Sequence, residues 1–168
     1  MGVSVTIPRR LYEKVAAMGV DVESWVVDLV LRGLNLDPED EAEIHLELAE
    51  KFLEEGRGLV DEDPAQASEK LYKAAEEAVK AAAYRMGLQD VIGRVRDRGR
   101  WTVTELERAT RSVSKVLGEG FRVGWDAANY LHVWGFQEAR LDSEAVRERL
   151  PYIEEMVKVA KRRLSGKP

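Results

Sequence analysis

Residues 63–87 decide the fold of this chain, and they read DPAQASEKLYKAAEEAVKAAAYRMG. Asp63 followed by Pro64 is a typical helix start, because the aspartate caps free amide groups and proline at the first helical position has no amide hydrogen to lose. Gly87 favours the end of the helix. The pattern predicts a central helix that neighbouring helices approach closely, since small and apolar side chains repeat at helical spacing: Ala67, Leu71, Ala74, Ala75, Ala78 and Ala82.

Charged residues fill the remaining positions of this helix. Glu76, Glu77 and Lys80 are spaced as intrahelical pairs, and we expect such pairs to be mostly exposed. Further helices are predicted on both sides, starting at Asp37-Pro38, at the Thr102–Glu105 capping box, in the aromatic segment from Phe121 and at Asp142. In the first of these, His45 lies off the apolar stripe of Ile44, Leu48 and Phe52, so we expect it at the surface.

The first 34 residues follow a different pattern. Val3, Val5 and Ile7 alternate with polar residues and predict a short strand, and two helices follow it, separated by Gly19. This order resembles the ribbon-helix-helix DNA-binding module, but Ser4 and Thr6 would offer only hydroxyls to the bases. We therefore predict a strand-helix-helix arm over residues 1–34 that packs or dimerises, followed by a helical bundle over residues 35–168.

Composition limits the classes of protein that are possible. The chain has 168 residues, of which 45% are hydrophobic and 34% charged, with no long apolar run and no signal-peptide pattern at its start. A cytoplasmic protein outside the membrane is expected. The absence of cysteine excludes disulfides and thiol chemistry, and with two histidines it leaves little material for a metal site, so no metal and no cofactor are predicted. Few amide side chains beside many Glu, Lys and Arg favour a thermophilic source.

The net charge of −5 is unevenly distributed. Residues 35–63 are strongly acidic, whereas a basic run follows the central helix, with arginines at Arg94, Arg96, Arg98 and Arg100. One interpretation is that the two regions are solvated or attract each other within the bundle or across a dimer. The other is that the four arginines form a phosphate-binding loop, because guanidinium groups bind phosphate well.

An aromatic segment over residues 125–138 is the strongest candidate for a site. Rings and polar side chains alternate there, which is typical either of a demanding core or of a pocket with polar groups in apolar walls. The candidate ligand-binding residues are Trp125, His132, Trp134 and Glu138, and the candidate catalytic residues are His132 and Asn129. On a helix His132 should face the same way as Trp125. The alternative is a half-buried histidine bonded to a polar neighbour.

Three motifs, residues 66–77, Gly99-Arg100-Trp101-Thr102 and Leu131–Phe136, together resemble the first PaREP family of archaeal paralogues, a family without an assigned activity. Its helical core is similar to the HEPN fold. The resemblance implies an all-α, HEPN-like antiparallel bundle that often dimerises. Many HEPN domains are metal-independent ribonucleases in which four to six residues separate an arginine from a histidine.

That signature is interrupted in this chain. With four to six residues between it and His132, the arginine's place is held by Trp125, Asp126 or Ala127, and Arg122 lies too far upstream. A carboxylate in place of the cation would repel a phosphate. The leading hypothesis is therefore a non-catalytic, homodimeric binding or interaction module whose partner is a nucleotide, RNA or a protein. The alternatives are a divergent ribonuclease, with a cation supplied from Arg94–Arg100 or by the other subunit, and a DNA-binding regulator acting through the arm.

Overall fold

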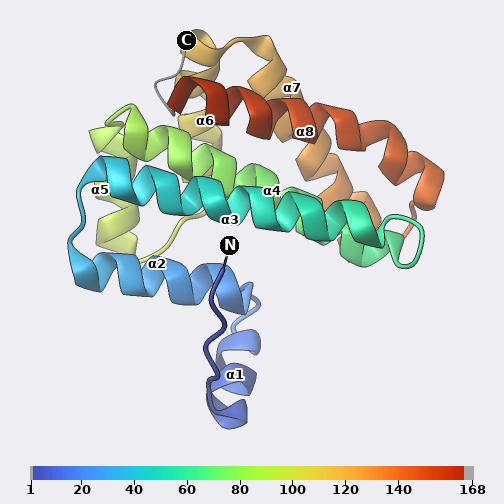
Figure 1. Cartoon of the computed structure of the whole chain (residues 1–168), viewed down its shortest axis with the longest axis horizontal. Coiled ribbons are helices and arrows are strands. Elements are labelled where there is room, and N and C mark those ends of the chain that lie inside the picture. The colour runs from blue at the N-terminus through green and yellow to red at the C-terminus, as the bar shows by residue number, and fades with distance from the viewer. Residues whose placement is uncertain (1, 165–168) are drawn as a thin grey trace. The chain divides into compact units, whose positions relative to one another are not determined.

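The structure is a computed structural model that describes residues 2–164, and helices form nearly all of its regular structure. Figure 1 shows their order along the chain. The elements are α1 (Arg9–Ala16), α2 (Val22–Leu34), α3 (Pro38–Leu59), α4 (Pro64–Arg85), α5 (Gln89–Arg98), α6 (Val103–Leu117), α7 (Glu119–Tyr130), a π-helix (Leu131–Gln137) and α8 (Ser143–Leu164). The prediction of an all-α fold is confirmed. The chain divides into two compact units, residues 1–36 and 37–168.

The first unit contains α1 and α2. Asp21 caps α2, because its carboxylate accepts a hydrogen bond of 2.8 Å from the Ser24 amide. The predicted strand over Val3–Ile7 is wrong: residues 2–8 are neither strand nor helix, and the side chains of Val3 and Val5 are exposed. Alternation alone did not make a strand here, since a strand also needs a partner for its backbone groups. The ribbon-helix-helix interpretation loses the strand on which it depends.

The second unit is built around α4. This helix packs against α3, α5, α6, α7, the π-helix and α8, and α3 is its most extensive neighbour. In Figure 1 the two run side by side through the middle of the bundle. Every residue of the predicted stripe on α4 is buried: Ala67, Leu71, Ala74, Ala75, Ala78 and Ala82. The prediction of a central helix is confirmed, and its small side chains explain how so many helices reach it.

The helix starts predicted at Asp37, Asp63 and Asp142 are also confirmed, whereas Thr102 makes no side-chain capping hydrogen bond at the start of α6. Asp37 accepts hydrogen bonds from the amides of Glu39 and Asp40, Asp63 accepts one from Gln66, and Asp142 accepts one from Ala145. Each carboxylate satisfies amide groups that the first turn of a helix leaves without a partner. Local sequence therefore sets where α3, α4 and α8 begin.

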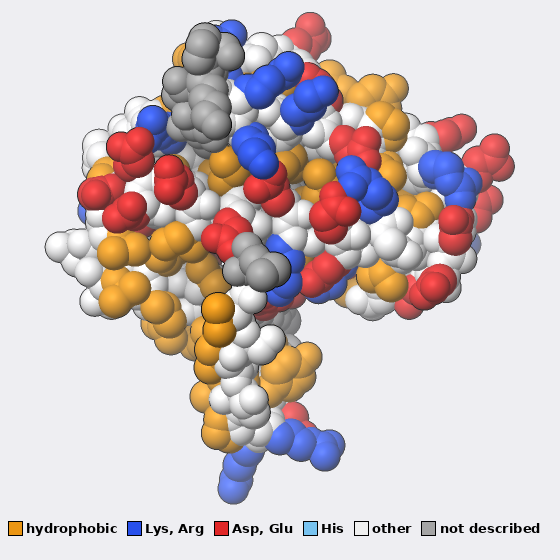
Figure 2. Space-filling model, viewed as in Figure 1, with side chains coloured by type: hydrophobic (Ala, Val, Ile, Leu, Met, Phe, Trp, Pro, Cys, Tyr) orange, Lys and Arg blue, Asp and Glu red, His pale blue; other side chains and the backbone are white. Residues whose placement is uncertain are grey.

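Ion pairs connect α8 with α3 and with the turn that follows α3. Arg57 binds Glu154, Arg147 binds Asp61, and Lys161 binds Glu50. Figure 2 shows acidic and basic side chains intermixed on this face of the molecule. Such exposed pairs contribute little stability individually, so they set the pairing of helices less than the buried apolar contacts do. None of the helices within residues 2–164 combines the length and apolar character needed to cross a bilayer.

Candidate functional site

The aromatic segment forms the end of α7 and the π-helix that continues it. Trp125 is fully buried, and its indole Nε1 donates a 2.9 Å hydrogen bond to Glu107 on α6. Asn129 donates from Nδ2 to the backbone carbonyl of Trp125 at 2.9 Å. The indole is packed in the core, and the Asn129 amide closes a bond within its own helix. Both contacts are those of core and helix structure.

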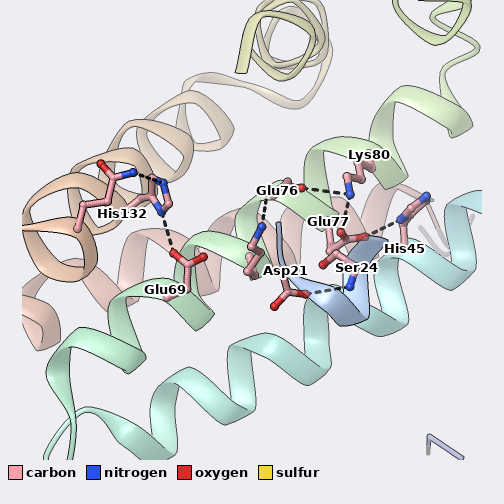
Figure 3. A network of polar contacts seen from close by, with 10 residues as sticks. Asp21, Ser24, His45, Glu69, Glu76, Glu77, Lys80 and His132 are labelled. Atoms are coloured by element: carbon pink, nitrogen blue, oxygen red, sulfur yellow. Dashed lines mark hydrogen bonds and ion pairs between the residues drawn. The ribbon is translucent and has the colours of Figure 1, made fainter. Parts of the chain in front are cut away.

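His132 is half-buried beside the first part of α4. Its Nδ1 lies 2.7 Å from the Glu69 carboxylate, and its Nε2 lies 3.1 Å from Gln137 Nε2, as the dashed lines in Figure 3 show. A carboxylate can only accept, so the His132 ring donates from Nδ1 to Glu69, and its Nε2 faces the Gln137 amide. The ring also stacks on Tyr72, with centroids 4.2 Å apart, and on Phe136 at 6.0 Å.

Tyr72 contacts both Trp125 and His132 of the aromatic segment. Its ring lies 5.8 Å from Trp125 and 4.2 Å from His132, so these two side chains face the same side of the helix, as the sequence predicts. Burial raises the pKa of the Tyr72 hydroxyl well above its ordinary value, and the nearby Glu76 and Glu69 raise it further. The phenol therefore stays protonated and acts as a wall of the site.

A second stripe on α7 and the π-helix points outward. Val123, Ala127, Tyr130 and Trp134 repeat at helical spacing, and Trp134 is 46% exposed. The Tyr130 and Trp134 rings lie 6.5 Å apart, and the Arg149 guanidinium of α8 lies 4.3 Å from the centre of the Tyr130 ring. We call this the aromatic surface, consisting of Val123, Ala127, Tyr130, Trp134, Arg149 and Tyr152.

An open cleft of about 550 Å³ lies on the aromatic surface between α7 and α8. Its walls include Val123, Arg149 and Tyr152, and acidic side chains from each helix, Asp126 and Glu148, complete its edge. Glu138, the remaining candidate ligand-binding residue, is exposed at the end of the π-helix and lies outside this cleft. Of the aromatic candidates, Trp134 alone contributes to an open surface.

The four candidate arginines lie elsewhere. Arg94, Arg96 and Arg98 are exposed on α5, and Arg100 follows that helix. Ile92 of α5 packs with Tyr84 near the end of α4, whereas His132 contacts Glu69 near its start. About 15 residues of α4 separate the two, which corresponds to roughly 22 Å. The structure therefore does not bring these arginines to His132.

The structure also contains a buried ionic network that sequence analysis missed. His45 is only 1% exposed, so its predicted surface position is wrong, and its Nδ1 lies 2.6 Å from Glu77. Lys80, also 1% exposed, lies 2.8 Å from Glu77 and 3.1 Å from Glu76. Figure 3 shows this network beside the His132–Glu69 pair on α4. The expectation that Glu76, Glu77 and Lys80 form exposed pairs is wrong, because α4 is surrounded by other helices.

Charge within this network is balanced by contact. Burial alone would raise the pKa of Glu77, but Lys80 and His45 outweigh burial and lower it to about 2. Burial also acts to raise the pKa of Glu76, and Lys80 and Lys73 lower it below its ordinary value. Both carboxylates are therefore ionised inside the bundle, where they depend on the cations beside them.

This network makes stability depend on pH. The folded-state pKa of Glu77, about 2, lies below the ordinary 4.5, so its contribution is present above pH 4.5 and is lost as pH falls through 2. We expect the free energy of unfolding to fall by about 3 kcal/mol over that interval. Chemical denaturation at successive pH values measures it. Glu77→Gln should flatten this dependence, and an equally steep fall in that variant would assign it to other groups.

No metal centre is evident in the described part of the chain, where no three His, Cys, Asp or Glu side chains converge on one point. The fold and these contacts define an all-helical protein with a buried ionic network and an exposed aromatic surface on one bundle. The chain belongs to the archaeal PaREP1/PaREP8 family, whose sequence model matches residues 44–157. That match runs from α3 to α8 and leaves the first unit outside.

Two solved structures are similar to this chain. A crystal structure of a protein from Sulfolobus solfataricus is 35% identical, covers 74% of this chain and 96% of its own, and superimposes with a TM-score of 0.58. A solution structure of the same structural-genomics target is 32% identical, covers 75% of this chain and 92% of its own, and has a TM-score of 0.55. No curated protein matches the sequence significantly.

Proposed function

We propose that this protein is a non-catalytic interaction module that forms a homodimer through its aromatic surface. The observation that carries the proposal is the continuous row of Tyr130, Trp134, Arg149 and Tyr152 on the outside of α7, the π-helix and α8. Tyrosine, tryptophan and arginine are the residues most enriched among those that dominate binding energy at protein interfaces. This surface is therefore the best candidate for a docking face.

Charge favours a second copy of the chain as the partner. Asp126 and Glu148 border the cleft beside Arg149. In a twofold dimer each copy presents the same patch, so acids on one side meet bases on the other. A patch with both signs around an apolar centre is complementary to itself, whereas a patch of one sign would repel its copy.

A non-catalytic role is supported by the surroundings of His132. Its contacts are Glu69, Tyr72, Phe136 and Gln137, which fix the orientation of the half-buried ring. Arg122, the nearest upstream arginine in the sequence, binds Glu107 and Asp126. A ribonuclease site would need a cation beside His132, but Arg122 is paired with these two acids. We therefore assign the histidine a structural role.

We also propose that the helical bundle is HEPN-like. Long helices α3, α4 and α8, with α7 and its π-helical continuation, pack around α4, and this arrangement supports a HEPN-like bundle. The cytoplasmic location and the thermophilic source stay predictions from composition.

The arm over residues 1–34 is proposed as a second contact between copies, because several of its large apolar side chains are exposed: Val3, Val5, Leu11, Tyr12, Met18, Leu29, Val30 and Leu34.

Analytical ultracentrifugation over a range of concentrations tests the dimer. We expect the wild type to dimerise and Trp134→Ala to weaken dimerisation at least about 30-fold, because removing a central aromatic typically costs 2 kcal/mol or more. Val116→Ser removes a 61% exposed apolar side chain from α6, outside the aromatic surface, and should leave the dissociation constant unchanged.

Two outcomes would contradict this proposal. A wild type that stays monomeric at every concentration removes the dimer. A dimer weakened by Val30→Ser on α2 and unaffected by Trp134→Ala moves the interface to the arm, because Val30 is 52% exposed there. Thermal unfolding of each variant shows whether the bundle stays folded.

A further inference from the structure

A second cleft lies where the start of α5 meets the exposed face of α6. It encloses about 560 Å³. Arg108 and Arg111 line it with the hydroxyl side chains Thr104 and Ser112. Residues three and four apart on a helix lie on one face, so these four side chains present their polar ends to the same space. The cleft belongs to neither the aromatic surface nor the surroundings of His132.

The two arginines are available for a ligand. Neither forms an ion pair within the described residues, in contrast to Arg122 and Arg98, which bind carboxylates. The segment 89–117 carries seven Lys or Arg and four acids, although the whole chain has a net charge of −5. The cleft lies in a basic segment of an acidic protein, and its own lining combines two arginines with the acids Asp90 and Glu107. Guanidinium groups favour phosphate because their parallel N–H groups match its oxygens.

Two acids in the cleft refine the choice of ligand. Glu107 accepts hydrogen bonds from Arg122 at 3.1 Å and from the indole of Trp125 at 2.9 Å, so its charge is offset by an internal partner. Asp90, in the first turn of α5, is exposed and has no such cation among the described residues. A carboxylate beside two arginines suits a molecule that carries a hydroxyl donor together with its phosphate.

We propose that this cleft binds a small phosphate ester that also bears hydroxyl groups, such as a sugar phosphate. Arg108 and Arg111 bind the phosphate oxygens, Ser112 and Thr104 donate further hydrogen bonds, and Asp90 accepts from a ligand hydroxyl. The site is independent of the proposed homodimer, since α5 and α6 contribute nothing to the aromatic surface. Its failure and the failure of the dimer are therefore separate results.

Isothermal titration calorimetry at low salt tests the site with ribose 5-phosphate, ribose and inorganic phosphate as probes. We expect ribose 5-phosphate to bind more tightly than inorganic phosphate, and ribose not to bind. Arg111→Ala should weaken binding of ribose 5-phosphate at least about tenfold, because it removes charged hydrogen bonds. Arg111→Lys should bind ribose 5-phosphate with an affinity between those of the wild type and Arg111→Ala, since it keeps the charge and loses the planar guanidinium group.

Arg100→Ala is the matched control. It removes the same charge from the same basic segment, but Arg100 is exposed and lies outside the cleft, so it should leave the affinity nearly unchanged. Equal losses in Arg100→Ala and Arg111→Ala would overturn the proposal in favour of a diffuse charge effect. Absence of binding by both phosphate probes would also overturn it, as would binding of a short single-stranded RNA without binding of ribose 5-phosphate. Thermal unfolding of each variant controls for folding.

Discussion

Replacing Lys80 with methionine is expected to destabilise the protein by about 3–5 kcal/mol. The Lys80 side chain is 1% exposed, and its ammonium group contacts both Glu76 and Glu77, which keep their negative charge inside the bundle. Methionine fills a similar volume without the charge, so the loss measures the two carboxylates left without this cation. Chemical denaturation at neutral pH gives the difference in the free energy of unfolding.

Two further variants separate charge from packing. Lys158→Met removes a lysine from an exposed position on α8 and should change stability by less than about 0.5 kcal/mol. Adding Glu77→Gln to Lys80→Met removes one of the orphaned charges and should recover part of the loss. If Lys80→Met lowers the free energy of unfolding by less than about 1 kcal/mol, the carboxylates of the buried ionic network do not depend on Lys80.

Replacing Gly124 with alanine should destabilise the protein by about 3 kcal/mol, at the upper end of the range for overpacked cores. An added Cβ would lie 2.6 Å from Met156 Cβ and 2.8 Å from the backbone oxygen of Tyr152. A backbone atom cannot rotate away as a side chain can, so α7 and α8 must separate. Thermal unfolding should show a melting temperature lower by about 6–12 °C.

Gly120→Ala is the control on the same helix. Nothing lies within 4 Å of an added Cβ at that position, and alanine favours helix over glycine. We expect its melting temperature to be unchanged or slightly raised. A comparable loss in both variants would mean that α7 tolerates no substitution of glycine, and the close approach of α7 to α8 would then not explain the effect at Gly124.

The fold was predictable where local chemistry decides it. Asp37, Asp63 and Asp142 cap their helices as the sequence predicts, because an aspartate acts on amides only two or three residues away. The alanine stripe identified α4 as the central helix for a related reason: small residues matter only where another helix approaches. The prediction of a strand over residues 3–7 was wrong because a strand needs a partner strand, which local sequence does not reveal.

The buried network was not predictable from spacing. Glu77 and Lys80 are three residues apart, the spacing of an ordinary exposed pair, and nothing local distinguishes the two cases. Their burial follows from α3, which brings His45 against Glu77. One signal was present: residues 78–84 are apolar except for Lys80, so this part of α4 is apolar on nearly every side, and such a helix is usually buried.

For the candidate site, sequence order was a partial guide. The prediction that Trp125 and His132 share a face is confirmed through Tyr72. The arginines of α5 were grouped with His132 by their chemistry, but the chain places them near the other end of α4. The aromatic surface depends on Arg149 and Tyr152 of α8, which no motif connects with Trp134.

The π-helix over Leu131–Gln137 limits the insertions and deletions that this part of the chain tolerates. Each of its hydrogen-bonded rings holds one residue more than an α-helical ring, so the segment is equivalent to an α-helix that has absorbed a single-residue insertion. Deleting one residue would restore α-helical register and rotate everything beyond it by about 100°. Gln137 would then leave His132, and α8 would begin from a different direction. Relatives that keep this bundle should vary here by substitution and conserve the length.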